Sequence, residues 1–593
     1  MPWRGRRKAR APAAGPALPA RSPARVAKAL TLAFAVTWLA ALVRLLPLTG
    51  FTVWGSDQGE YAALLEGFLR TGGSTPAAYA GWGVAYPDFP GTYALAGSVA
   101  AISGVDAFLV LSVAIPAAAA LTALVAFALT LRLTGSLRAS TVAGALVAVA
   151  MPEAFAGSHA MPGALGGLLA FSAVAAAVFA AKSPAARWAV VAFALALVPT
   201  HHLSAFIAGA ALLTVAAVEA RRGPADRAQG RLVDSALAGA AVLLVTSALF
   251  WVYAAPRFRA GVLDPVSPTV ALLLPSAAIL GVVGAWASAY WFETRARPAP
   301  AAFHLFHERR TMARLVGACA AAAAAAAVVA TVGVPGTSAV IPPEGALLFL
   351  PLALVLAMAS AGPGRLAPVR GGLAPTAAVV AVLGSMAVGL VLLPTVLIPY
   401  RHLQYFVDFA APLVAVALTF AARAGAVTLL PGRPRSHRWV ATLLVAAALA
   451  AASATAYPSK SALAGYEEGT TVHEAAAVTW MAWDLPHTVV VTDHRLSSLA
   501  FGFANQRATW DEGGPVLHGD AEQARAGLDT VPDPRGTTGV TAVLLTQDIV
   551  GGAALSQWAP ARAIEGAALE KFSGPGFVKV FDNGDAVAYW ALR

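Results

Sequence analysis

Residues 54–61, with the sequence WGSDQGEY, place two carboxylates, Asp57 and Glu60, directly after a long apolar run over residues 29–48. That run is long enough to cross a bilayer as a helix, which rises about 1.5 Å per residue. A new helix is expected to begin near Asp57, and carboxylates at this spacing share one face of a helix. Acidic groups at the mouth of a membrane domain are typical of a functional site.

The composition identifies a membrane protein. Of the 593 residues, 58% are hydrophobic and only 12% are charged, which excludes a soluble globular chain. Apolar runs recur until about residue 455, and charged and turn residues then return to normal density. We predict thirteen spans, at 29–48, 106–131, 139–156, 163–181, 188–200, 203–219, 232–254, 269–291, 313–332, 345–361, 373–393, 404–422 and 439–456.

The basic residues indicate the orientation of these spans. Lys and Arg collect in the head of the chain and on alternate loops. The opposite loops hold only Arg44, Arg70, Arg257, Arg259 and Arg401. By the positive-inside rule the N-terminus is predicted in the cytoplasm, and an odd number of spans in the plasma membrane puts the C-terminal region outside. The net charge of +11 therefore reflects topology, and no nucleic-acid partner is predicted.

The predicted fold class is a polytopic α-helical membrane protein with a C-terminal extracytoplasmic α/β domain. We expect a disordered basic cytoplasmic tail over 1–28, a transmembrane domain over 29–456 with a long first outer loop at 49–90, and the α/β domain over 457–593. In that domain a helix and strands are expected at 472–483, 488–492, 540–545, 577–581 and 586–592.

Two absences in the sequence exclude other classes. There is no Walker pattern and no G-x-G-x-x-G between a strand and a helix, which argues against ATP-driven transport and against a Rossmann-bound nucleotide sugar. Cys319 is the single cysteine, so the chain has no internal disulfide.

Asp57 and Glu60 are the candidate catalytic residues. A carboxylate at this position can act as a general base toward an acceptor hydroxyl or amide, or as a ligand of a divalent metal, Mg or Mn. The alternative is helix capping, with Asp57 at the helix N-terminus and Glu60 in its first turn.

Arg401 is nearly alone as a cation of the outer loops, at the start of a predicted span. An isolated guanidinium at this depth favours an anion such as a lipid phosphate, and the alternative is contact with the headgroups of the bilayer. Its neighbour His402, and Arg257 with Arg259, are further candidates for binding the phosphate.

Three outer-loop histidines are candidate metal ligands together with Asp57: His159, His201 and His202. Adjacent side chains on a helix diverge by about 100°, so His201 and His202 are not expected to bind one ion together. The alternative for each is a histidine packed within its loop.

Three stretches carry a resemblance to a known family. They are residues 55–61 followed by 69–72, residues 86–93 leading to 104–105, and residues 158–162, with a closing hairpin at 580–590. In their order and shared face they resemble the GT-C superfamily of membrane glycosyltransferases. The loops are similar to those of protein mannosyltransferase-like members, and the topology is similar to the catalytic subunit of oligosaccharyltransferase.

The resemblance implies transfer of a sugar from a polyprenyl-phosphate carrier to a protein, glycan or lipid acceptor, with membrane lipids around the enzyme. The C-terminal region lacks a Trp-Trp-Asp-Tyr-Gly sequence, which favours a single sugar over an oligosaccharide transferred to asparagine. Oligosaccharyltransferase-like transfer of a lipid-linked glycan, a transporter or flippase of lipid-linked sugars, and a non-catalytic assembly subunit are the alternatives.

Overall fold

The computed structural model is mostly helical. It describes residues 22–76, 79–221, 227–265, 308–333, 342–391, 399–429, 434–463, 465–533, 539–555 and 561–592, and the single positions 276, 279, 283 and 536. Most of the predicted tail, and the predicted span at 269–291 apart from three single positions, lie outside the described residues. Helix α1 begins at Pro23, whose fixed φ suits the first turn of a helix, so the end of the predicted disordered tail is helical.

Each of the other predicted spans coincides with one or two helices. They are α1 (Pro23–Leu45), α4 (Ala107–Ala119), α5 (Leu121–Thr134), α6 (Leu137–Val149), α7 (Met151–Ser158), α8 (Pro162–Ala180), α9 (Ala186–Leu197), α10 (His202–Ala220), α11 (Arg227–Leu249), α14 (Glu308–Val332), α15 (Pro343–Ala357), α17 (Ala374–Val391), α18 (Leu403–Leu429) and α19 (Pro434–Ser453).

The predicted number of spans is not confirmed by the described part of the chain. Among the described residues, seven helical stretches are long and apolar enough to cross a membrane, or eight if the bent pair α6 and α7 forms one span. Helix α9, for example, has only 12 residues, fewer than the roughly 20 that a straight crossing needs. The structure supports a multi-pass membrane protein, and the count of thirteen is not confirmed.

The C-terminal region forms a five-stranded sheet in the order β4-β3-β5-β7-β6. Strand β3 is parallel to β4 and β5, and β7 is antiparallel to β5 and β6. The elements are β3 (Val489–Val491), β4 (Arg507–Ala508), β5 (Ala542–Thr546), β6 (Phe577–Asp582), β7 (Ala586–Ala591), α20 (Val472–Asp484), α21 (His494–Gly502), α22 (Gly514–His518), α23 (Ala521–Thr530), α24 (Gln547–Gly552) and α25 (Ala567–Glu570). The helix and strands expected from the sequence are present.

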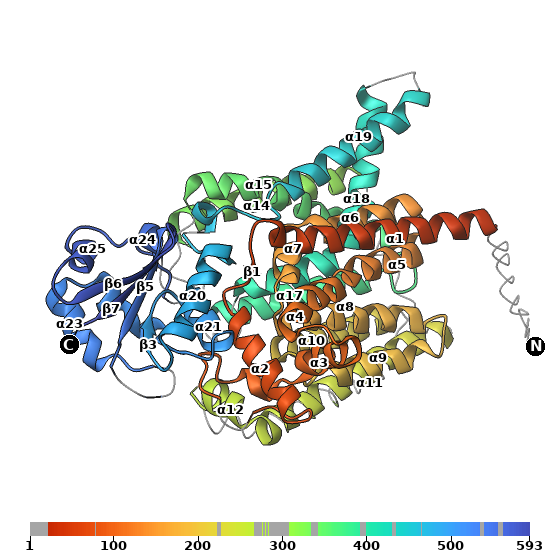
Figure 1. Cartoon of the computed structure of the whole chain (residues 1–593). Coiled ribbons are helices and arrows are strands. Elements are labelled where there is room, and N and C mark those ends of the chain that lie inside the picture. Colours follow the sequence, from red (N-terminus) through yellow and green to blue (C-terminus); the bar gives the residue numbers. More distant parts are fainter. Residues whose placement is uncertain are drawn as a thin grey trace, which may run out of the picture.

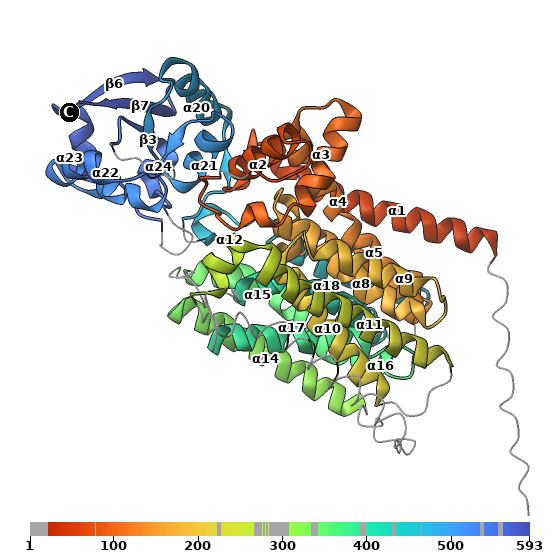
Figure 2. The same cartoon turned by 90° about the horizontal axis from the view of Figure 1, so that it is seen from below.

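The sheet lies at one end of the helical bundle, and the start of α1 lies at the other end (Figure 1). The predicted first outer loop, 49–90, folds as β1 (Val53–Trp54), α2 (Gln58–Arg70) and the short turn η2 (Tyr86–Asp88), and α3 (Gly91–Ser103) follows it. Figure 2 shows α2 beside α21 of the C-terminal region. Strand β1 also pairs antiparallel with β2 (Gly469–Thr470), which ties the loop to the start of that region.

Two glycines allow α2 and α21 to touch backbone to backbone. A Cβ atom added at Gly59 would lie 2.0 Å from the Ser498 carbonyl oxygen, and one at Gly502 would lie 1.6 Å from the Gly59 carbonyl oxygen. No other residue type fits at either position without a shift of one helix. This contact fixes the first turn of α2 against the middle and the C-terminal end of α21.

Candidate active site

Asp57 precedes α2, but its side chain does not cap the helix. Both of its carboxylate oxygens accept hydrogen bonds from elsewhere. The Tyr86 hydroxyl donates to Oδ2 at 3.1 Å and the Tyr61 hydroxyl to the same atom at 3.4 Å, while Nε2 of His494 lies 3.0 Å from Oδ1. The capping alternative therefore does not account for this carboxylate.

His494 comes from the C-terminal region, where α21 begins directly after β3. Asp493 caps that helix by accepting a hydrogen bond from the Leu496 amide, which places His494 in its first turn. The imidazole lies edge-on to Trp82 at 4.9 Å between ring centroids and 5.6 Å from Trp510. Two indoles thus fix the ring that faces Asp57.

The electrostatics of the site keep Asp57 ionised. Burial by itself raises the pKa of this carboxyl, but the hydrogen bond and charge of His494, the hydrogen bond from Tyr86 and the charge of Arg401 outweigh burial and lower the pKa below its usual value. Arg401 is therefore close enough for its charge to act on Asp57, and its charge acts on the Tyr86 hydroxyl as well.

Glu60 has a different environment from Asp57. Its side chain is buried, and its carboxylate accepts hydrogen bonds from the amides of Trp82 and, at 2.9 Å, Gly83. Burial and then the negative charge of Asp57 raise the pKa of Glu60 to about 7. The contacts of Glu60 hold the loop that carries Trp82 over His494.

Glu468 holds the other side of the Asp57 loop. It accepts a hydrogen bond from the Ser56 amide at 2.8 Å, and Nε2 of His159 lies 3.5 Å away. His159 also contacts the Phe155 carbonyl oxygen through Nδ1 at 2.7 Å and lies against Trp54. Burial lowers the pKa of His159, but the hydrogen bond and charge of Glu468 raise it by more than burial lowers it. The pKa of His159 is therefore higher than its usual value.

The other candidates for phosphate binding have protein partners. The amide of Arg257 donates to Oδ2 of Asp88 at 2.8 Å, and its guanidinium donates to the Pro76 carbonyl oxygen at 3.2 Å. Nε of Arg259 lies 3.4 Å from Oδ1 of Asp264. His402 is fully buried, with Nε2 2.8 Å from the Ser385 hydroxyl. The contacts described for these residues do not reach Asp57.

The proposed metal ligands do not converge in the described part of the chain. His201 caps α10 and contacts the Ser204 hydroxyl at 2.7 Å through Nδ1, and the ring of His202 packs on Phe258 at 4.7 Å. His159 faces Glu468, as described above. Among the described residues, no group of three or more His, Cys, Asp or Glu side chains has the geometry to hold a metal ion.

Sequence reasoning missed His494, Glu468 and Tyr86. Tyr86 falls within the loop predicted to be functional, but nothing singled out its side chain. For His494 a signal exists: Thr492-Asp493-His494-Arg495 follows a buried strand directly, and ligands of α/β sheets commonly bind where parallel strands end. Glu468 follows another acid, Glu467, at the start of the C-terminal region, a position without a distinctive pattern.

Solved structures resemble this architecture. The oligosaccharyltransferase AglB from Archaeoglobus fulgidus, in complex with an inhibitory peptide and a dolichol-phosphate, aligns with a TM-score of 0.55 and 16% identity over 88% of this chain and 70% of its own. A structure of the A. fulgidus oligosaccharyltransferase with Zn and sulfate aligns with a TM-score of 0.53 and 16% identity over 88% and 68%. No family model and no curated protein sequence matches the chain.

A further structure, ArnT from Cupriavidus metallidurans bound to undecaprenyl phosphate, covers 96% of this chain and 98% of its own at 13% identity, with a TM-score of 0.43 that is too low to carry an argument. The oligosaccharyltransferase alignments define the class of fold. The chain has the GT-C glycosyltransferase fold, which confirms at the level of architecture the resemblance seen in the sequence.

Proposed function

We propose that this protein is a membrane glycosyltransferase that moves a sugar from a polyprenyl-phosphate carrier to an acceptor on the extracytoplasmic face. The observation that carries the proposal is the ionised Asp57 carboxylate, held by His494 and Tyr86 and close to the charge of Arg401. A dolichol-phosphate bound to the oligosaccharyltransferase of the same fold supports a lipid-phosphate carrier.

In the proposed reaction the acceptor oxygen or nitrogen attacks the anomeric carbon of the carried sugar. The bond from that carbon to the phosphate oxygen breaks, and the lipid phosphate leaves with the electron pair. Asp57 takes the proton of the acceptor as general base. His494 is a positioning residue, because it acts on the reaction through the orientation and the pKa of Asp57.

The leaving phosphate needs a cation. The Arg401 guanidinium can bind a phosphate through two parallel N–H···O hydrogen bonds. Its positive charge also contributes to the lowered pKa of Asp57. Asp57 as a ligand of Mg or Mn remains a prediction, since the described residues supply no group of ligands around it. Loss of transfer on chelation by EDTA, restored by either ion, would support that role, and full activity in EDTA would remove it.

The side of the membrane is part of the proposal. The basic loops favour a cytoplasmic N-terminus, with Asp57 and the C-terminal sheet outside. Reporter fusions after Leu592 test this arrangement. Strong activity of a reporter that works only in the cytoplasm would reverse the orientation and contradict an extracytoplasmic site.

Transfer of a lipid-linked glycan to protein is a second candidate. The fold likeness to an oligosaccharyltransferase bound to an inhibitory peptide favours it. Purified protein incubated with radiolabelled polyprenyl-phosphate sugars, and separately with a lipid-linked oligosaccharide and acceptor peptides, separates the two. Label from the first set released as free sugar or moved to an acceptor supports the first proposal; label found only in peptide supports the second. A transporter or flippase would give neither product but would move the carrier across vesicle membranes.

A further inference from the structure

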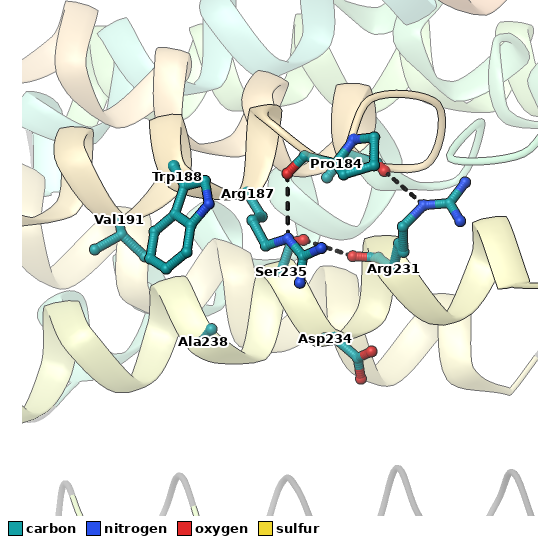
Figure 3. Close-up of a pocket in the computed structure, with 9 residues that line it drawn as sticks. Pro184, Arg187, Trp188, Val191, Arg231, Asp234, Ser235 and Ala238 are labelled. Carbon is teal, nitrogen blue, oxygen red and sulfur yellow. Dashed lines mark hydrogen bonds between the residues drawn. The ribbon is translucent and has the colours of Figure 1, made fainter.

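A cavity lies far from Asp57, at the end of the bundle where α1 begins. It has a volume of about 230 Å³ and is formed by the end of α8, the loop that follows it, and the facing sides of α9 and α11 (Figure 3). Figure 1 places the first turns of α9 and α11 at the end of the bundle opposite the five-stranded sheet. The cavity is therefore separate from the candidate active site.

One end of the cavity is cationic. Nε of Arg187 donates to the Pro184 carbonyl oxygen at 3.1 Å, and Arg231 donates through Nη2 to the Ala181 carbonyl oxygen at 2.9 Å. These bonds hold both guanidinium groups beside the loop, as Figure 3 shows. Asp234 is the only acid among the lining residues, so two cations and one anion leave this end positive.

The other end of the cavity is apolar. Trp188, Val191 and Ala238 line it, further along α9 and α11 than the two arginines (Figure 3). The Trp188 side chain is 71% exposed although it lies in the first turn of an apolar helix. An exposed indole at a helix end is typical of the interface between headgroups and acyl chains, where its ring is partly in lipid and partly in water.

We propose that this cavity binds an anionic glycerophospholipid of the membrane leaflet on the side of the N-terminus. Its phosphate lies between Arg187 and Arg231, and the first part of an acyl chain lies along Trp188 and Val191. Fixed guanidinium groups favour a phosphate because they form charge-assisted hydrogen bonds without first losing side-chain freedom. Basic pockets between membrane helices bind anionic headgroups by this chemistry. The site does not depend on the proposed transferase activity.

Quenching of tryptophan fluorescence tests the proposal. The full chain in detergent is titrated with phosphatidylglycerol brominated on its acyl chains and, separately, with equally brominated phosphatidylcholine. We expect saturable quenching by phosphatidylglycerol at a concentration about tenfold lower than by phosphatidylcholine. Trp188→Phe should remove the saturable part of the signal, which assigns it to this cavity among the 14 tryptophans.

The variant that tests the headgroup is Arg187→Gln, because Arg231 also holds the end of α8 and its loss can disturb the fold. Arg187→Gln should weaken phosphatidylglycerol binding about tenfold and leave phosphatidylcholine unchanged. Arg138→Gln, at an exposed arginine of α6 outside the cavity, is the matched control and should match the wild type. Three results would each overturn the proposal. They are equal quenching by the two lipids, an unchanged affinity for phosphatidylglycerol in Arg187→Gln, and binding of inorganic phosphate alone at the cavity with no quenching by the brominated acyl chains.

Discussion

Nε2 of His494 lies 3.0 Å from Oδ1 of Asp57, although the two residues are 437 positions apart in the chain. The contact joins the first turn of α21, in the C-terminal region, to the loop that follows the first membrane helix. Neither segment forms the site alone. The pairing of β1 with β2 and the glycine contact between α2 and α21 hold the two segments together, and this keeps Asp57 next to His494.

Replacing His494 should change the pH dependence of transfer. His494 lowers the pKa of Asp57 through a hydrogen bond and its charge, so the base of the wild type stays ionised well below neutral pH. In His494→Gln the pKa of Asp57 should rise, so the acidic limb of the pH–rate profile should move to higher pH. Initial rates of transfer from pH 4 to 8 measure the shift.

Tyr86→Phe removes only one of the hydrogen bonds to Asp57 and should shift the same limb by less. An acidic limb near pH 7 in the wild type would instead point to Glu60, whose pKa is about 7, as the base. A limb that does not move in His494→Gln would show that the histidine has no influence on the ionising group.

Glu60 should make the stability of the protein depend on pH. Its pKa is about 7 in the fold against 4.5 in its usual state, so the folded protein holds a proton that the unfolded chain releases. Its unfavourable contribution therefore begins as pH rises above 4.5 and is complete above about 7, with an upper bound of roughly 3 kcal/mol. Glu60→Gln should lower the melting temperature less at pH 8 than at pH 5. A difference of equal size at both values would contradict the raised pKa.

Much of the Asp57 loop was predictable from the sequence because its signals are local. An apolar run of span length, acids at helical spacing and a long following loop all lie within residues 29–90. The helix after Asp57 and the strands of the C-terminal region were expected for the same reason, since hydrophobic periodicity is read over short windows.

The rest of the site depends on contacts that no local pattern encodes. His494 reaches Asp57 only because α21 packs against α2, and Glu468 reaches Ser56 only because β2 pairs with β1. Asp57 has the residue type and position of a helix cap, and only the tertiary contacts show that its side chain turns elsewhere. The predicted span count is not confirmed among the described residues, because apolar runs do not reveal where a helix is short or bent, as at α6 and α7.

Gly502→Ala should separate α21 from α2. The added methyl group would lie 1.6 Å from the Gly59 carbonyl oxygen, so one helix must move. We expect destabilisation of about 1–3 kcal/mol or more, together with loss of transfer because His494 shifts with its helix. Thermal melting and transfer rates measure the two effects. Gly551→Ala, at a position with no neighbour within 4 Å, is the control and should be close to neutral.

Arg401 should act on the donor and not on the acceptor. Losing a charge-assisted hydrogen bond costs roughly 1.5–3 kcal/mol, which corresponds to a tenfold to hundredfold weaker donor affinity. We expect Arg401→Ala to reach the upper part of that range and Arg401→Lys the lower part, because lysine keeps the charge but cannot form two parallel bonds. Binding of a polyprenyl phosphate to the purified variants measures this effect, and unchanged affinity in Arg401→Ala would remove the residue from the site.

The central claim is that Asp57 performs the chemistry of sugar transfer. The most direct test compares the wild type, Asp57→Asn and Asp106→Asn with radiolabelled polyprenyl-phosphate sugars, counting label that is released or transferred. Asp106 is an exposed helix cap of α4, and asparagine caps a helix as well as aspartate does, so its variant is the matched control. We predict that Asp57→Asn abolishes turnover while it binds the carrier and melts near the wild-type temperature, and that Asp106→Asn stays fully active. Near-normal turnover in Asp57→Asn would contradict the claim.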